Sequence, residues 1–287
     1  MVDSSPEPPK LEIPAFKPPR PSSSTLSATT NPTEPQIFEA AKASMSTSYP
    51  YDRTKVAFLV ETRPLPHLPA LFAHMMSVIP PEWTFRFMGG PAALEYMRAN
   101  PILARYEKAG KLSFLDVPPN YSLKDRDTIS QMFTDHHLYS NILAPAEHLL
   151  VFQPDSIFCA GASKTLDDFL HYDWIGAPWS ATSQFGGNGG LSLRKVSKIL
   201  QVLENKKRTN TGMPFEDEWL SRELNALPGA QMAKADVSKT FSVESVWDEK
   251  PLGYHIGWMG VHHPQVCSSH LLCVVLLKLL TDPLDLG

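Results

Sequence analysis

The sequence is poor in cysteine and has no long hydrophobic run. Its three cysteines, Cys159, Cys267 and Cys273, match no metal-ligand spacing. So few cysteines are typical of a reducing compartment and disfavour a disulfide scaffold. The apolar stretch from Leu271 to Leu280 has ten residues, whereas a membrane-spanning helix needs roughly 20. Because the first thirty residues also lack the apolar segment of a signal peptide, we expect a cytoplasmic protein without a membrane span.

The sequence also lacks an excess of positive charge. It contains 26 lysines and arginines against 30 aspartates and glutamates, which gives a formal net charge of −4. A protein that binds nucleic acid usually carries a basic surface, so this balance disfavours nucleic acid as a main partner. No GxGxxG turn follows the first predicted strand, which disfavours a dinucleotide site of the Rossmann type.

Proline is unevenly distributed along the chain. Residues 1–50 hold ten of the 27 prolines, together with serine and threonine runs. Such a composition cannot bury enough apolar surface to offset the entropy of ordering, so we expect a disordered N-terminal arm. Pro18, Pro19 and Pro21 are compatible with a partner that binds proline-rich peptides.

Hydrophobic periodicity from Lys55 onward predicts alternating strands and helices. We expect strands over 56–60, 83–88, 112–117, 149–152 and 191–194, and helices over 68–79, 92–98, 196–203 and 216–224. Residues 122–139 are expected to be partly helical, and 231–234 and 239–243 to form short strands. The alternation at the beginning implies a parallel sheet with right-handed crossovers. We therefore expect one α/β domain over 55–260, followed by an atypical tail over 261–287.

The stretch from His148 to Cys159 contains the most informative strand of the predicted sheet. Leu149 to Phe152 are uninterrupted apolar residues, as in a strand that is buried on both faces. Pro154 ends this strand, which leaves Asp155 at the carboxyl end, where open α/β sheets place their ligands. A carboxylate there can hold a divalent cation, and the cation can hold a diphosphate. The alternative is that Asp155 only closes an Asx-turn.

Two further segments suit a ligand site. Four glycines surround Asn188 in the segment 186–190, where they permit close approach of the backbone to a ligand or a hairpin turn. Three acids, Glu216, Asp217 and Glu218, open a predicted helix after a polar loop. They either complement the helix dipole or present a general base.

Taken in order, several segments resemble one family. VAFLVETRP, LAPAEHLLVFQPDSIFC, YDWIGAPW, GGNGGLSLRK, FEDEWL and PLGYHIGW are similar to the fungal proteins of the domain-of-unknown-function 5672 family, over Lys55 to Gly260. That family in turn resembles glycosyltransferases of the GT-A fold. The resemblance implies a GT-A-like, Rossmann-like α/β fold with a mixed, mainly parallel sheet flanked by helices. It also implies transfer of a sugar from a nucleoside diphosphate sugar to a hydroxyl acceptor.

The resemblance assigns a chemical role to particular residues. Asp155 and His255 would hold Mn²⁺ or Mg²⁺, while Gln153 replaces the first acid of the usual Asp-x-Asp motif. Glu216 or Asp217 would take the proton of the acceptor, and the resembling enzymes favour Asp217. The residues expected to bind substrate are Glu61, Arg63, Gln153, Asn188, Gly189, Gly190 and Arg194.

Three other functions remain open from the sequence. Gln153 and the unusual tail favour a nucleotide-sugar-binding protein that has lost catalysis. A different phosphate-handling enzyme on the same sheet is a second alternative, because a fold does not determine a function. An interaction protein that works through its proline-rich arm is the third. The donor sugar, the acceptor and the stereochemical outcome cannot be read from the sequence.

Overall fold

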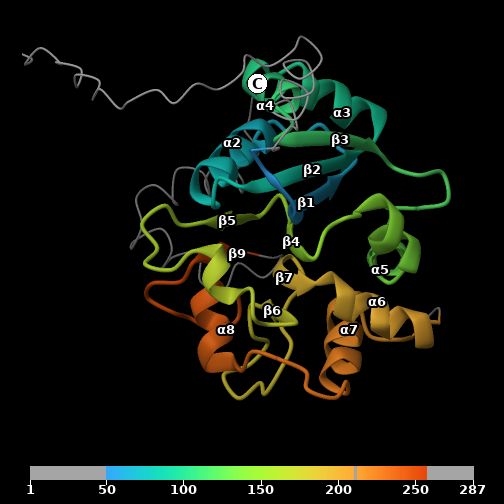
Figure 1. The fold of residues 1–287 in the computed structure, drawn as a ribbon, viewed down its shortest axis with the longest axis vertical. Helices are drawn as coiled ribbons and strands as arrows, with labels where there is room; N and C mark the ends of the chain where they lie inside the picture. The colour runs from blue at the N-terminus through green and yellow to red at the C-terminus, as the bar shows by residue number, and fades with distance from the viewer. Residues whose placement is uncertain (1–49, 210–211, 257–287) are drawn as a thin grey trace, which may run out of the picture. The chain divides into compact units, whose positions relative to one another are not determined.

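The computed structural model describes residues 50–209 and 212–256. The expected proline-rich arm, the atypical tail, Cys267 and Cys273 lie outside the described residues. The described chain contains a six-stranded sheet in the order β3-β2-β1-β4-β7-β6 (Figure 1). Its strands are β1 (Asp52–Glu61), β2 (Trp83–Gly89), β3 (Leu112–Asp116), β4 (His148–Phe152), β6 (Trp174–Gly176) and β7 (Leu191–Lys195). Strands β1 to β4 pair in parallel, whereas β7 is antiparallel to β4 and β6. The prediction of a mixed, mainly parallel sheet is confirmed.

A second, three-stranded sheet lies beside the first. It contains β5 (Ser156–Phe158), β9 (Gly253–His255) and β8 (Ser242–Val243) in the order β5-β9-β8. Strand β5 follows β4 after a short turn, and Ser156 pairs with His255 in the antiparallel β5–β9 ladder. This ladder therefore brings the last described strand next to the turn that follows β4.

Helices connect most of the strands. They are α2 (Leu68–Val78), α3 (Pro91–Arg98), α4 (Pro101–Lys108), α5 (Arg126–Phe133), α6 (Val196–Asn205), α7 (Glu216–Asn225) and α8 (Ala235–Phe241). Two short helical turns are η1 (Leu138–Ile142) and η2 (Leu166–Phe169).

Helix α8 corrects one prediction, because most of the segment 239–243 is helical. Only Ser242 and Val243 of that segment form a strand. Ala235, Ser238 and Phe241 are buried at three-residue spacing, a helical period that the predicted strand overlooked. The segment predicted as a strand over 231–234 contributes a single bridge, from Met232 to Trp174.

The sheet separates two apolar layers, because alternate residues of a strand face opposite sides. Ala57 and Leu59 of β1 belong to a cluster that includes buried residues of α2, α3, α4 and α8. Val56 and Phe58 belong to a second cluster with residues of η1, α5, α6 and α7. Strands β1 and β4 both contribute residues to the two clusters and are thus buried on both faces, as their uninterrupted apolar sequences predict.

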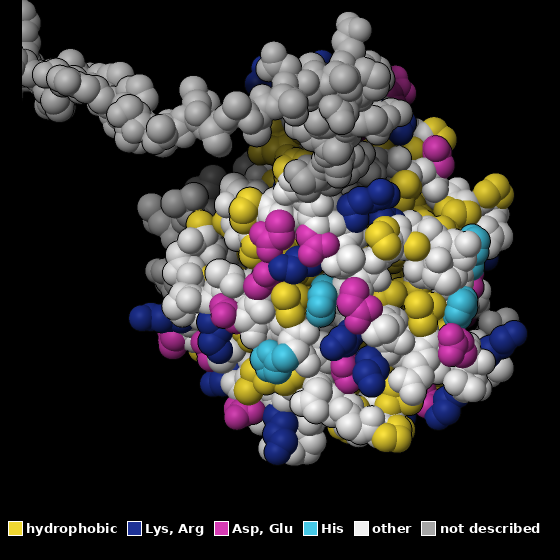
Figure 2. Space-filling view, viewed as in Figure 1, with side chains coloured by type: hydrophobic (Ala, Val, Ile, Leu, Met, Phe, Trp, Pro, Cys, Tyr) yellow, Lys and Arg dark blue, Asp and Glu magenta, His cyan; other side chains and the backbone are white. Residues whose placement is uncertain are grey.

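The outside of the described chain has a mixed polar character. On the face shown in Figure 2, acidic and basic side chains are interspersed among polar and apolar ones. Among the helices of the described residues, none is both long enough and apolar enough to cross a lipid bilayer.

Candidate functional site

A pocket of about 570 Å³ opens at the carboxyl ends of β1 and β4. One part of its wall comes from the turn after β4 and from β9, with Gln153, Asp155 and His255. Another part comes from the segment before β7 and from the start of α7. There Asn188, Gly189, Gly190, Glu216 and Asp217 line the pocket. Because β7 is antiparallel to β4 and Phe152 pairs with Leu191, the beginning of β7 lies beside the end of β4.

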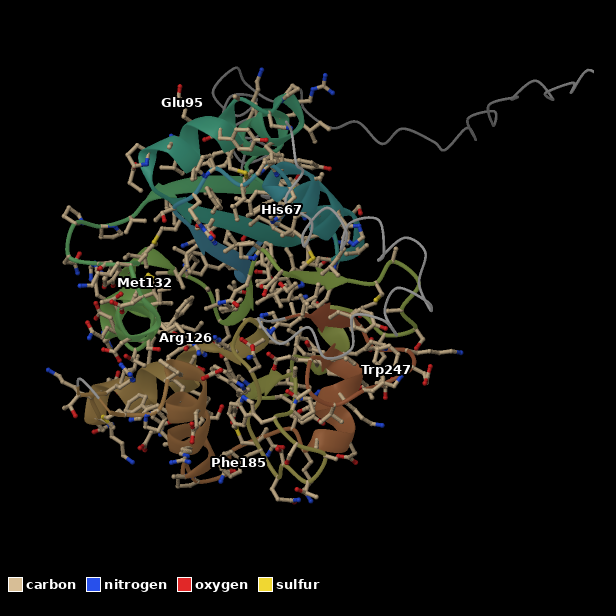
Figure 3. The ribbon with its side chains drawn as sticks, turned by 180° about the vertical axis from the view of Figure 1, so that it is seen from behind. His67, Glu95, Arg126, Met132, Phe185 and Trp247 are labelled. Atoms are coloured by element: carbon tan, nitrogen blue, oxygen red, sulfur yellow. The ribbon has the colours of Figure 1, made fainter. Side chains whose placement is uncertain are left out.

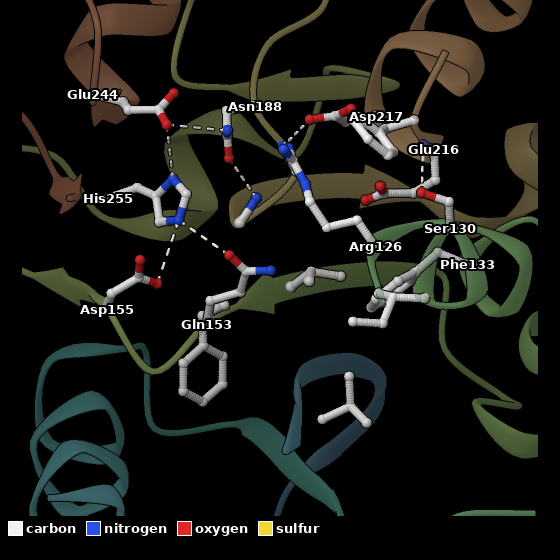
Figure 4. A pocket seen from close by; sticks show the side chains of 17 residues that line it. Arg126, Ser130, Phe133, Gln153, Asp155, Asn188, Glu216, Asp217, Glu244 and His255 are labelled. Atoms are coloured by element: carbon white, nitrogen blue, oxygen red, sulfur yellow. Dashed lines mark hydrogen bonds and ion pairs between the residues drawn. The ribbon is translucent and has the colours of Figure 1, made fainter. Parts of the chain in front are cut away.

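The turn after β4 is closed by Ser156. The Ser156 hydroxyl accepts the backbone N–H of Gln153 at 2.9 Å and donates to its carbonyl at 2.8 Å. The backbone N–H of Ser156 closes the same turn on the Gln153 carbonyl at 3.0 Å. With the turn closed in this way, the Asp155 carboxylate is directed toward His255 (Figure 4).

Polar atoms from the two walls converge on the imidazole of His255 (Figure 4). Nε2 of His255 lies 3.1 Å from Oε1 of Gln153 and 3.4 Å from Oδ1 of Asp155. On the other side of the ring, Nδ1 is 3.6 Å from Oε1 of Glu244. The His255 side chain is 4% exposed, so the ring is enclosed by these three partners. The predicted pair Asp155 and His255 is brought together by the fold.

Glu244 is a functional candidate that the sequence did not reveal. It follows the two-residue strand β8, and its carboxylate accepts the amide N–H of Asn188 at 3.2 Å. The side-chain oxygen of Asn188, Oδ1, in turn accepts the backbone N–H of Gly190 at 2.7 Å. Glu244 therefore connects the imidazole of His255 to the glycine segment, and no local pattern around residue 244 indicates this role.

Burial and charge change the proton affinities of this cluster. Burial raises the pKa of the Glu244 carboxyl, against the opposing effect of His255. For His255, burial alone would lower the pKa, but the hydrogen bond and charge of Asp155, together with the charges of Glu244 and Asp217, raise it above its ordinary value. The imidazole thus favours the protonated form more than a free histidine does, at a position between two carboxylates.

The two glycines before β7 are required by close packing. A Cβ on Gly190 would overlap the imidazole of His255 and lie 2.5 Å from Oε1 of Gln153. A Cβ on Gly189 would lie 2.6 Å from Oε1 of Glu216. Real Cβ atoms essentially never approach other heavy atoms so closely, so a larger residue at position 190 would have to displace the enclosed His255 ring, and one at position 189 the end of the Glu216 side chain.

The acids at the start of α7 have different surroundings. Asp217 accepts the backbone N–H of Gly189 at 3.0 Å and that of Glu218 at 2.8 Å. Oε1 of Glu216 lies 3.2 Å from a guanidinium nitrogen of Arg194. Burial, followed by the charge of Asp217, raises the pKa of the Glu216 carboxyl, although Arg194 opposes this. Both acids line the pocket, and each also contacts a residue outside α7.

Arg194 lies behind the pocket wall. It is fully buried, with its guanidinium carbon 4.3 Å from the ring centre of Trp174 and 5.0 Å from that of Phe133. It donates to the Ser192 hydroxyl at 2.9 Å and to the Gly189 carbonyl at 3.1 Å. Arg194 therefore reaches the pocket only through Glu216 and the glycine segment.

Glu61 and Arg63 are absent from the residues that line this pocket. Glu61 is the last residue of β1 and Arg63 lies just beyond it; the two bind each other, with Nη2 of Arg63 at 2.7 Å from Oε2 of Glu61. The hydrogen bonds that Arg63 donates to Glu61 raise the pKa of the Arg63 guanidinium, and the charge of Asp155 adds to this rise. The pair is thus close enough to Asp155 to interact with its charge, but it lies beside the pocket, and the Arg63 side chain is 70% exposed.

Solved structures similar to this chain are glycosyltransferases, each at low identity. A mannosyltransferase from Pyrobaculum calidifontis, in complex with GDP-Man and Mn²⁺, is 12% identical, with a TM-score of 0.39 over 64% of this chain and 57% of that one. Glycosyltransferase GlyE of Streptococcus pneumoniae is 12% identical, with a TM-score of 0.46 over 80% of this chain and 61% of that one. The mannosyltransferase Ktr4p of S. cerevisiae is 7% identical, with a TM-score of 0.37 over 62% of this chain and 71% of that one.

The aligned region thus spans less than two thirds of the Pyrobaculum and Streptococcus chains. No curated protein matches the sequence. The profile of the family described as protein of unknown function (DUF5672) matches residues 111–255, which are 145 of the 287 residues and so just over half of the chain. The matched segment includes the turn after β4, the glycine segment, the start of α7 and His255. The chain belongs to this family, DUF5672.

Proposed function

We propose that the pocket transfers a sugar from a nucleoside diphosphate sugar to a hydroxyl group of an acceptor. The observation that carries this proposal is that two separate pairs of ionisable side chains lie within one pocket. Asp155 and His255 lie together on one wall, and Glu216 and Asp217 lie together on another. The volume of about 570 Å³ is within the range of pockets that enclose small molecules, roughly 300–1,000 Å³.

Asp155, Gln153 and His255 suit a divalent cation such as Mn²⁺ or Mg²⁺. Octahedral ligand atoms about 2.1 Å from an ion are about 3 Å from one another, close to the 3.1 and 3.4 Å that separate Nε2 of His255 from the two oxygens. Glu244 beside Nδ1 resembles the carboxylate that often orients a metal-binding histidine. When bound, such an ion would neutralise the charge of a departing diphosphate.

The donor set is incomplete without a substrate. Among the described residues, no three side chains of histidine, cysteine, aspartate or glutamate form a metal site on their own. Mg²⁺ and similar ions are commonly held by one or two carboxylates together with phosphate oxygens of the substrate. We therefore expect cation and nucleoside diphosphate to bind together, each with higher affinity in the presence of the other.

Glu216 and Asp217 supply the proton acceptor. In the reaction, the acceptor oxygen forms a bond to the anomeric carbon while the bond from that carbon to the diphosphate oxygen breaks. The hydroxyl proton passes to Asp217 or Glu216. A carboxylate within hydrogen-bond reach of the hydroxyl is the ordinary requirement for this step, and both side chains line the pocket.

Calorimetric titration with a panel of nucleotide sugars and nucleoside diphosphates, with and without Mn²⁺, tests this proposal. We expect Mn²⁺ to increase the affinity for at least one nucleoside diphosphate, and Asp155→Asn to remove that increase without lowering Tm. Asp236→Asn, which removes an exposed acid from α8, is the matched control. Binding that responds neither to chelation nor to Asp155→Asn would contradict the proposed metal site.

A nucleotide-sugar-binding protein without catalysis is the second candidate. Gln153 favours it, because an amide stands where the resembling enzymes have an acid, and its oxygen lies beside His255. The amide removes one negative charge from the cation site, which weakens it. Donor binding without release of nucleoside diphosphate, across a panel of sugar and peptide acceptors, would favour this candidate over the transferase.

A further inference from the structure

Arg126 differs from the other charged side chains in the pocket. The pocket is lined by four carboxylates, from Asp155, Glu216, Asp217 and Glu244, and Arg126 is the one lysine or arginine among its described lining residues. Within the part of the chain that the structure describes, the Arg126 guanidinium has no hydrogen bond and no ion pair, although Asp217 and Glu244 line the same space.

The guanidinium of Arg126 is held by an aromatic ring. Its carbon lies 4.1 Å from the ring centre of Phe215, the residue that precedes α7. Figure 3 shows Arg126 where α5 meets α6 and α7, and in Figure 4 its side chain extends from α5 into the pocket. Stacking on a ring occupies one face of a guanidinium and leaves its N–H groups free along the edge.

The backbone that carries this pair is fixed by other contacts. Asp125 caps α5 by accepting the backbone N–H of Thr128 at 2.8 Å. The Ser130 hydroxyl accepts the backbone N–H of Glu216 at 3.2 Å and so joins α5 to the start of α7. Arg126 is the first residue of α5 and Phe215 directly precedes α7. The connection between the two helices therefore holds both residues in place.

We propose that Arg126, supported by Phe215, is an oxyanion subsite that binds a phosphate or carboxylate group of the ligand. A guanidinium presents paired N–H donors that match such a group in two parallel hydrogen bonds. Positive charge inside an otherwise acidic pocket also lowers the cost of admitting an anion. The oxyanion comes either from the diphosphate of the donor or from an acidic group of the acceptor. The inference rests on the proposed function for its choice of ligands.

The subsite also explains the exposure of Phe215. The ring is 39% exposed, one of few large apolar side chains in the described chain with such exposure. An exposed ring at a pocket wall is not needed for the core, because α7 is buried through Trp219, Leu220 and Leu224. Its contact with Arg126 is a reason for a phenylalanine at this position, since stacking reduces the freedom of a long side chain.

Binding measurements in the presence of EDTA test this subsite without any requirement for catalysis. The donor arm uses UDP, GDP and inorganic pyrophosphate, and the acceptor arm uses glucuronate with glucose as its neutral match. We expect Arg126→Gln to lower the affinity for the anions of one arm about tenfold or more. Arg126→Lys should lower that affinity less. Phe215→Leu should produce a smaller loss, because it removes the ring and leaves the charge.

Arg222→Gln is the matched control, because Arg222 lies on α7 with 61% exposure and pairs with Glu218. Equal affinity of wild-type protein and Arg126→Gln for every anion would overturn the subsite, and so would a wild-type protein that binds none of them. A loss confined to UDP, GDP and pyrophosphate identifies the donor as the source, and a loss confined to glucuronate identifies the acceptor. If transfer is never found but the loss is, the subsite stands and the transferase proposal fails.

Discussion

The carboxylate of Asp217 accepts the backbone N–H of Gly189 at 3.0 Å, which joins the start of α7 to the glycine segment before β7. The other oxygen of Asp217 accepts the backbone N–H of Glu218 at 2.8 Å. A carboxylate has about four acceptor positions, so both oxygens keep a position for a further proton donor. The side chain is thus oriented by the backbone and still able to accept a hydroxyl proton.

This orientation leads to a prediction for Asp217→Asn. We expect turnover to fall roughly 10²–10⁴-fold, with donor affinity nearly unchanged, because the amide cannot accept the proton. The measurement is steady-state turnover with donor titration, once an acceptor is found. Glu216→Gln serves as the comparison, since Glu216 is the neighbouring acid that lines the same pocket. Small and equal losses in both variants would remove the general base from the mechanism.

A second prediction concerns the guanidinium of Arg194. Its fork bonds to Ser192, Gly189 and Glu216 while its faces contact Trp174 and Phe133. Arg194→Lys keeps the charge but loses the planar fork, so we expect the free energy of unfolding to fall by about 1–3 kcal/mol. Urea unfolding measures this change. Arg222→Lys on the exposed side of α7 should change stability by less than about 0.5 kcal/mol, and a similar loss in both variants would contradict the prediction.

A third prediction follows from the packing of Gly190. Gly190→Ala places a methyl group against His255 and Gln153, so we expect the Mn²⁺-dependent part of nucleoside diphosphate affinity to disappear. Gly161→Ala is the matched control, because nothing lies within 4 Å of its added Cβ. Calorimetric titration of both variants with and without Mn²⁺ checks this. Unchanged binding in Gly190→Ala would show that the cluster around His255 does not hold the cation.

A fourth prediction concerns pH and stability, through Lys111, which lies at the amino end of β3. Burial lowers the pKa of this ammonium from 10.5 to about 8, although it donates to the Pro81 carbonyl at 2.6 Å. Between these values the unfolded chain binds a proton that the folded chain has released. This contribution therefore raises the free energy of unfolding as pH increases from about 8, by at most about 1.4 kcal/mol per pH unit.

Urea unfolding of wild-type protein and Lys111→Met across this range isolates the Lys111 contribution. As pH rises above 8, the free energy of unfolding of the wild type should increase relative to that of Lys111→Met. A difference that stays constant with pH would show that the ammonium keeps its ordinary pKa when the chain is folded.

Local patterns in the sequence predict the central sheet well. The apolar runs at Val56 and Leu149 are buried on both faces. A strand buried on both faces needs apolar residues at consecutive positions, so its sequence reveals it. Helix α4 and helix α8 were not predicted. Leu103 is the one buried residue of α4, so the helix has almost no apolar period, and in α8 the period of buried residues includes the polar Ser238, which weakens it as an apolar pattern.

The site was predictable only in part, for a physical reason. Asp155 follows a strand, Asn188 lies among glycines before a strand, and Glu216 and Asp217 open a helix, positions that a sequence pattern marks. Glu244 and Arg126 have no such mark, because their roles come from contacts with residues far away in the chain. Pairing of Ser156 with His255 is equally invisible in either segment alone.

The pairing of β1 with β4 has a consequence for how the protein is made. Lys55 pairs with His148, so one edge of β1 stays without its partner until the ribosome has synthesised more than ninety further residues. That edge belongs to Val56, Ala57 and Phe58, all apolar, and unpaired apolar edges recruit other chains. The nascent chain therefore exposes this apolar edge until β4 emerges, and this protein should depend on chaperones during synthesis more than after it.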